Sequence, residues 1–156
     1  MLLADDPAYA DRAAALAKRV RDATEFLAAL PLCEPPGPAR PRRVAYHDPC
    51  HLAHAQGIRS APRALLAAIP GVTLVPMDDD DLCCGSAGHY NVMQPATASR
   101  LVARKVAAIR ASGADLVATA NAGCALQLEA GLRAEGISMP VRHVLDMLAE
   151  AYRASR

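Results

Sequence analysis

The sequence predicts one α/β domain: a four-stranded, mainly parallel sheet with helices on both faces, preceded by an N-terminal helix. Two observations support this fold class. After residue 41, short apolar runs alternate with segments of helical periodicity, and a strand followed by a helix re-enters the sheet in the same direction. The chain has 156 residues, 53% of them hydrophobic, which is enough for one buried core.

The N-terminal part is predicted to be a helix joined to the rest by a linker. Asp5 or Asp6 is suited to cap this helix, and Pro7 suits its first turn. The linker contains four prolines and a glycine, which forbid regular structure, and its Cys33 is expected to be a bystander rather than a ligand. The expected parts are an N-terminal helical segment over residues 1–32, which we interpret as the remnant of a preceding half, a Pro-rich linker over 33–41, and the α/β domain over 42–156.

The elements of the α/β domain follow from local patterns. Strands are expected where apolar residues run continuously or alternate, and helices where they recur at helical spacing between Pro or Gly stops. The predicted strands are 42–47, 72–75, 115–120 and 141–144, and the predicted helices are roughly 62–69, 95–110, 125–134 and 145–153. The run 115–120 is almost wholly apolar, as expected of a strand buried on both faces.

Composition excludes several classes of function. The formal net charge is +1 with acidic and basic residues interspersed, so no broad basic surface for nucleic acid is expected. No apolar run approaches the length of a membrane span and no signal-peptide pattern is present, so we expect a cytoplasmic protein. The acidic run 78–81 is expected to be a solvated loop. Gly85 and Gly88 lack the spacing of a dinucleotide fingerprint, so we do not expect NAD.

Four of the five cysteines follow predicted strands. Cys50 comes just after the first strand, Cys83 and Cys84 lie in the loop after the second, and Cys124 comes just after the third. In a parallel sheet these loops emerge at the same carboxyl edge, where ligand sites of open α/β sheets form. We therefore expect the four thiols to converge on one site.

The chemistry of that site leaves three alternatives open. Thiolates suit zinc or an iron–sulfur cluster, and the adjacent Cys83 and Cys84 fit a polynuclear cluster better than one small ion. Peptide N–H groups of the Gly85 and Gly88 loop, and of a helix after Cys50, could stabilise cluster sulfides. Zinc on the same thiols predicts a structural module, and a strained, easily reduced Cys83–Cys84 disulfide predicts a thiol redox domain.

Polar residues beside the thiols are expected to play supporting roles. His51, His54 and His89 lie near the thiols in sequence, and each is expected to be a hydrogen-bond partner or a surface residue rather than a ligand. His51 is the one we place next to the cofactor. Asn121 is expected either to lie near the cofactor or to cap the helix that follows it.

Three stretches of the sequence resemble one known family. They are residues 47–59 (HDPCHLAHAQGIR), 83–88 (CCGSAG) and 121–124 (NAGC). They are similar to the cysteine-rich CCG domain of heterodisulfide reductase subunits, lactate-utilisation proteins and the glycolate oxidase iron–sulfur subunit. The resemblance is stronger to the carboxyl-terminal domain of the glycolate oxidase subunit, and it covers nearly the whole chain.

The resemblance implies an iron–sulfur electron-transfer module held by Cys50, Cys83, Cys84 and Cys124. The cluster would be a [4Fe–4S] cubane or a non-cubane variant. Members with the complete motif hold a non-cubane cluster with five thiols, whereas here Asn121 stands where that motif has its fifth cysteine. The module would be a non-catalytic subunit of a glycolate dehydrogenase complex, in which FAD in a partner subunit oxidises glycolate to glyoxylate. The resemblance also implies a missing N-terminal half of ferredoxin type and peripheral association with the inner face of a membrane through the complex.

Overall fold

The computed structural model describes residues 3–31 and 41–153. Cys33 and most of the predicted linker lie outside the described residues. The four strands are β1 (Arg42–His47), β2 (Val72–Val75), β3 (Leu116–Thr119) and β4 (Val141–His143). They form one sheet in the order β2-β1-β3-β4, and every pairing is parallel. The predicted fold class is therefore confirmed, and all four strands lie within a residue or so of their predicted bounds.

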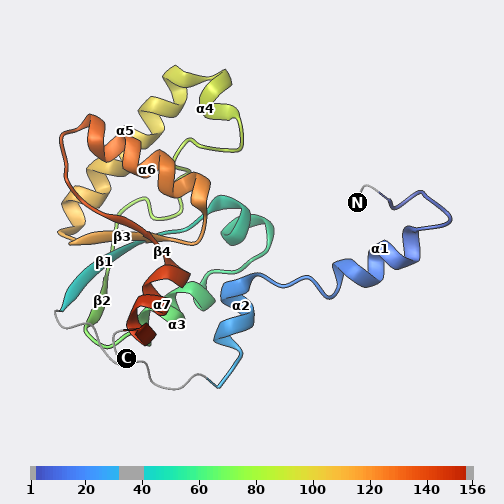
Figure 1. Ribbon diagram of the computed structural model, residues 1–156. Helices are drawn as coiled ribbons and strands as arrows, with labels where there is room; N and C mark the ends of the chain where they lie inside the picture. Colours follow the sequence, from blue (N-terminus) through green and yellow to red (C-terminus); the bar gives the residue numbers. More distant parts are fainter. Residues whose placement is uncertain (1–2, 32–40, 154–156) are drawn as a thin grey trace.

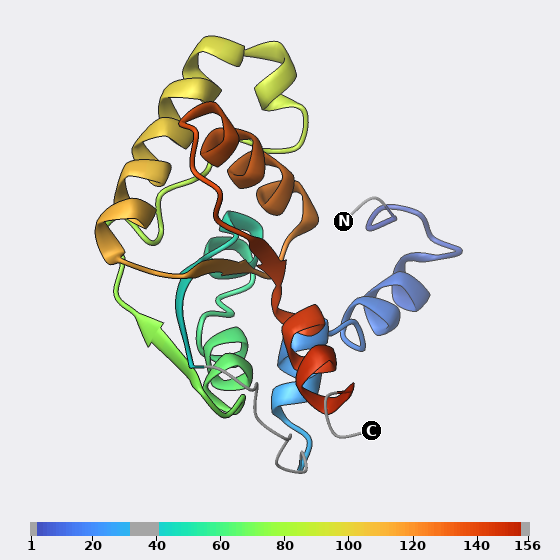
Figure 2. The same ribbon diagram turned by 60° about the vertical axis from the view of Figure 1, so that its left-hand side comes forward.

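Helices cover both faces of the sheet (Figures 1 and 2). On one face lie α5 (Pro95–Ser112) and α6 (Ala122–Ala134), and on the other lie α3 (Ser60–Ala67) and α7 (Val144–Arg153). Successive strand residues point to opposite faces, so Ala45 and Val117 join the core under α5 and α6, whereas Val44, Tyr46 and Leu116 join the core under α3 and α7. Both cores are built mainly from aliphatic side chains.

The N-terminal helix that the sequence predicts is divided into two. The structure has α1 (Ala10–Ala17) and α2 (Ala23–Ala28). The first helix ends at Ala17, and the second begins after Asp22, whose carboxylate caps α2 by accepting from the Thr24 N–H at 2.8 Å. The predicted cap was wrong: Asp6 instead accepts from the Ala8 N–H in the turn before α1. Figure 2 shows α1 standing apart from the sheet, and none of its residues is buried.

Two short elements lie outside the predicted helix ranges, and both lie next to the cysteines. One is η1 (His51–Ala55), a single turn of π-helix directly after Cys50, and the other is α4 (Tyr90–Met93), which follows the Cys83-Cys84 loop. Neither shows an apolar periodicity long enough to be recognised. Within the part of the chain that the structure describes, no helix has the length and hydropathy needed to span a membrane.

Candidate metal centre

Three soft donor groups meet at the carboxyl edge of the sheet. His47 is the last residue of β1, Cys84 lies in the loop after β2, and Cys124 lies in the first turn of α6. A ring nitrogen of His47 and the two Sγ atoms all lie within 4.8 Å of one another, and all three residues are buried. Parallel topology thus delivers groups far apart in sequence to one point, as expected for this edge.

The other two predicted thiols lie beside this group. Cys50 and Cys83 are partly buried, and all four cysteines of the described chain are free thiols. Burial raises the pKa of Cys83, the Gly85 N–H lowers it, and the Cys84 and Cys50 thiols raise it further. Cys50 and Cys83 also act on the pKa of Cys124. The structure therefore brings together the four thiols that the sequence singled out.

The two buried thiols, Cys84 and Cys124, are hydrogen-bonded to each other, and their pKa values shift in opposite directions. A hydrogen bond from the Cys124 thiol lowers the pKa of Cys84, and the adjacent His47 ring and the Ser86 N–H add to this effect against burial. The same hydrogen bond, together with burial, raises the pKa of Cys124. Cys84 is therefore the thiol of this pair that ionises first, and thiolate is the form that binds metal ions.

The loop that carries the adjacent cysteines depends on glycine. Gly85 has φ = 90°, and a Cβ placed there would lie 2.8 Å from the Ala98 carbonyl oxygen of α5. The resulting turn directs the Gly85 N–H to the Cys83 Sγ at 3.3 Å, while the Ser86 N–H acts on Cys84. Backbone N–H groups thus point at the sulfur atoms, as expected for the Gly85 loop. Gly88 also has a left-handed φ of 66°, but nothing lies within 4 Å of a Cβ there.

Asn121 fixes the start of α6. Its Oδ1 accepts from the Cys124 N–H at 2.9 Å, which confirms the expectation that it caps this helix. Because of this cap, α6 begins at Ala122, three residues earlier than predicted, and Cys124 belongs to the helix. Gly123 precedes Cys124, and because it has no side chain, the side chains of Asn121 and Ser86 can lie close to its backbone. A Cβ there would lie 3.1 Å from the Asn121 Oδ1 and 3.3 Å from the Ser86 Oγ.

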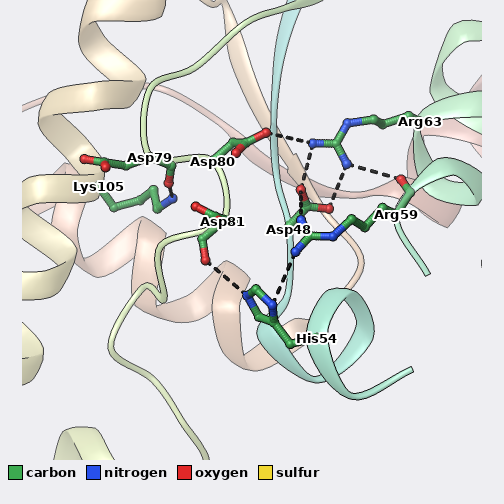
Figure 3. Close-up of polar contacts among 8 residues, drawn as sticks. All are labelled: Asp48, His54, Arg59, Arg63, Asp79, Asp80, Asp81 and Lys105. Carbon is green, nitrogen blue, oxygen red and sulfur yellow. Dashed lines mark hydrogen bonds and ion pairs between the residues drawn. The ribbon is translucent and has the colours of Figure 1, made fainter. Parts of the chain in front are cut away.

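A charged network joins the β1 end to the acidic loop (Figure 3). Asp48 is 2% exposed, and its two oxygens accept from Arg63 at 2.8 and 2.7 Å. Arg63 also donates to Asp80 at 3.1 Å, and its guanidinium lies 4.8 Å from the Tyr46 ring centroid. Asp79 pairs with Arg104 at 2.7 Å. The run 78–81 is therefore partly ion-paired rather than simply solvated.

The three histidines that the sequence placed near the thiols are all exposed. His54 belongs to the charged network, where its Nδ1 lies 3.3 Å from Arg59 and its Nε2 lies 3.5 Å from the Asp81 carbonyl oxygen (Figure 3). His89 precedes α4, and His51 is exposed on η1. The histidine that does reach the thiols is His47, which sequence reasoning treated as an ordinary strand residue. Its place at the carboxyl end of β1, on the Ala45 face, was the signal that could have found it.

The arrangement of thiols identifies the family when it is combined with sequence comparison. A family model described as "CCG: Cysteine-rich domain" matches residues 44–129. The chain belongs to this cysteine-rich domain family. The match runs from β1 into α6, so it includes the four thiols and His47.

Similar curated proteins carry the domain within longer chains. A "Probable glycolate oxidase iron-sulfur subunit" of Bacillus subtilis is 39% identical over 153 residues, which cover 96% of this chain and 34% of that protein. A "Lactate utilization protein A" of Shouchella clausii is 33% identical over 147 residues, covering 94% of this chain and 62% of that protein. A fumarate reductase (CoM/CoB) subunit of Methanothermobacter marburgensis is 39% identical over 111 residues, covering 70% and 23%. The chain thus spans about one third to three fifths of the first two relatives.

Proposed function

We propose that Cys50, Cys83, Cys84 and Cys124 hold an iron–sulfur cluster and that this domain transfers electrons within an oxidoreductase complex. The observation that carries the proposal is the convergence of four free thiols at one sheet edge, two of them buried. The names of similar proteins, above all an iron-sulfur subunit of a probable glycolate oxidase, support the same assignment.

The donor set fits such a cluster. Thiolates are the ligands of iron–sulfur centres, and the pKa of Cys84 is already lowered, which reduces the cost of deprotonating it for metal binding. When bound, the cluster would supply reversible one-electron transfer. The protein's own contribution is to hold the thiols, to direct the N–H groups of Gly85 and Ser86 at them, and to bury Cys84 and Cys124 away from water.

The wider complex is the part of the proposal that rests on the relatives. Oxidation of glycolate to glyoxylate releases two electrons and two protons. A flavin in a partner subunit would take them as a hydride and a proton, and the electrons would pass singly through this domain to a membrane acceptor. The complex would lie in the cytoplasm, against the inner face of the membrane, and this chain would be a non-catalytic part of it. The same arrangement would serve lactate or another 2-hydroxy acid, because the flavin subunit would select the substrate.

Anaerobic purification tests the proposal directly. We expect a brown protein with iron and acid-labile sulfide in equal amounts and an EPR signal on reduction or oxidation, which would also separate a cubane from a non-cubane cluster. The Cys84→Ser and Cys124→Ser variants should lose most of the iron. Cys33→Ser, which changes a cysteine expected to be a bystander, is the matched control and should keep it. A colourless, iron-free protein after anaerobic reconstitution would overturn the proposal.

Structural zinc is the second candidate, and one observation favours it. The donors of His47, Cys84 and Cys124 lie within 4.8 Å of one another, a spacing small enough for three ligands of one tetrahedral ion, since zinc–sulfur and zinc–nitrogen distances are about 2.3 and 2.1 Å. This alternative predicts one zinc per chain, no sulfide, no visible absorption and unfolding on chelation. The same metal and sulfide measurements on the purified protein distinguish the two.

A further inference from the structure

His47 is a buried imidazole without a conventional partner. Its side chain is 1% exposed, and within the described part of the chain neither Nδ1 nor Nε2 has a hydrogen-bond partner of good geometry; the group with which the ring does interact is the Cys84 thiol, whose pKa it lowers. Buried polar side chains are nearly always hydrogen-bonded, because burying one unpaired costs free energy. The nearest chemically distinct groups are the sulfur atoms of Cys84 and Cys124. Such an imidazole, aimed at two buried thiols, has the surroundings of a metal ligand.

The position where the family's fullest motif has a fifth thiol does not supply a donor here. Asn121 occupies that position, and its Oδ1 is already committed to the Cys124 N–H at 2.9 Å. A side chain that caps a helix in this way is held by that role. The centre therefore has four thiols, and His47, at the end of β1, belongs to the same group of donors.

We propose that His47 is a direct ligand of the metal centre, with Cys84 and Cys124, and that it is a fifth donor beside the four thiols. Imidazole nitrogen binds both iron and zinc. The kind of metal centre therefore rests on the proposed function, whereas the role of His47 as a ligand does not. It also accounts for a ring that would otherwise be buried with two unsatisfied nitrogens.

The second ring nitrogen has a candidate acceptor. A histidine that binds a metal almost always donates its other N–H to a neighbouring oxygen, which fixes the ring. Thr119 is paired with His47 across β1 and β3, so both side chains project from the same face of the sheet. Its Oγ1 is buried and has no partner among the described residues. No hydrogen bond joins the two side chains in the structure, so Thr119 is the positioning residue that would accept this N–H once the other ring nitrogen binds a metal.

Pulsed EPR tests the ligation on the unaltered chain. The protein would be prepared anaerobically with its iron–sulfur centre and with either natural or ¹⁵N-labelled histidine, then brought to its paramagnetic state. We expect a strong nitrogen hyperfine coupling that changes with the isotope and that disappears in His47→Ala. It should persist in His89→Ala, the control, which removes an exposed histidine that precedes α4. An iron-loaded protein without isotope-sensitive coupling would overturn the assignment of His47 and leave the proposed function standing.

Cobalt titration tests the same ligand without iron. Reduced, metal-free protein would be titrated with Co²⁺ and followed by its thiolate charge-transfer and ligand-field bands, with circular dichroism as a check on folding. Since losing a residue that merely orients a ligand lowers metal affinity about 10–100-fold, we expect His47→Ala to lose about 100-fold or more and Thr119→Val about 10-fold. Equal affinity in His47→Ala and His89→Ala would contradict direct ligation. If the protein held no iron but its cobalt site required His47, the proposed function would fail and the ligand assignment would stand.

Discussion

The loop of adjacent cysteines should be sensitive to one methyl group at Gly85. Its φ of 90° and the contact of a Cβ with the Ala98 backbone at 2.8, 3.0 and 3.3 Å impose two separate costs on Gly85→Ala. A left-handed backbone costs a non-glycine residue about 1–2 kcal/mol, and overpacking against fixed neighbours costs about 1–3 kcal/mol. Their sum is about 2–5 kcal/mol, and at about 2–4 °C per kcal/mol for a chain of this size the melting temperature should fall by about 10 °C.

Gly88→Ala is the matched control for this prediction. Gly88 lies in the same loop and has φ = 66°, but nothing lies within 4 Å of a Cβ there. It should therefore incur the backbone cost alone, about 1–2 kcal/mol. Both variants would be unfolded with urea as metal-free, reduced protein, so that metal binding does not contribute to the free energy of unfolding.

The metal content of the two variants provides a second comparison. Relief of the clash at Gly85 requires the loop to move away from α5, and this loop carries Cys83 and Cys84. We therefore expect Gly85→Ala to lose metal as well as stability, whereas Gly88→Ala retains it. Equal destabilisation by the two substitutions, or full metal content in Gly85→Ala, would refute the reasoning that backbone packing against α5 sets the position of the thiols.

Three further predictions concern residues around the site. Arg63→Met should cost about 3 kcal/mol in urea unfolding, because the buried carboxylate of Asp48 would keep only its longer, 3.7 Å contact with Arg59, and Arg63→Lys should cost less; equal losses would contradict the role of the two-pronged contact. Asn121→Ala should lower the free energy of unfolding by about 1 kcal/mol through loss of the α6 cap, whereas Asn121→Asp, which keeps an acceptor, should not. Burial lowers the pKa of Lys105 below 10.5 in the folded protein. Between that lowered pKa and 10.5 the unfolded chain binds more protons than the folded chain, so the free energy of unfolding rises with pH. This rise should be absent when Lys105→Met is unfolded at a series of pH values.

The sheet and the convergence of the thiols could be predicted because both follow from local patterns. Strands such as β3 are buried on both faces and are therefore continuous apolar runs, and parallel topology then places the residues after each strand at one edge. The convergence of Cys50, Cys84 and Cys124 could therefore be predicted without knowing how the side chains pack. The cap at Asn121 was also predictable, since asparagine before a helix accepts from its first turn.

The parts that could not be predicted depend on contacts between distant segments. His47 looks like any polar residue at a strand end until the loop after β2 and the first turn of α6 are placed against it. In the same way, Asp79 and Asp80 look like part of a solvated acidic loop in the sequence. Their ion pairs form only when the fold places Arg104 of α5 beside Asp79 and Arg63 of α3 beside Asp80. The division of the N-terminal helix has a local cause instead: Asp22 can either continue a helix or cap the next one, and periodicity alone does not decide between these.

Ligation by His47 would affect the charge of the site. A neutral imidazole ligand would give the buried centre one negative charge fewer than a thiolate in its place. Fewer negative charges favour the reduced state of an iron–sulfur centre, and histidine ligands raise the potential of such centres relative to thiolates. Lys105 acts in the same direction, because it is fully buried on α5 and close enough to Cys84 for that thiolate to raise its pKa. As a ligand, His47 would thus act with Lys105 to tune the centre toward accepting electrons, while Asn121 caps the helix that carries Cys124.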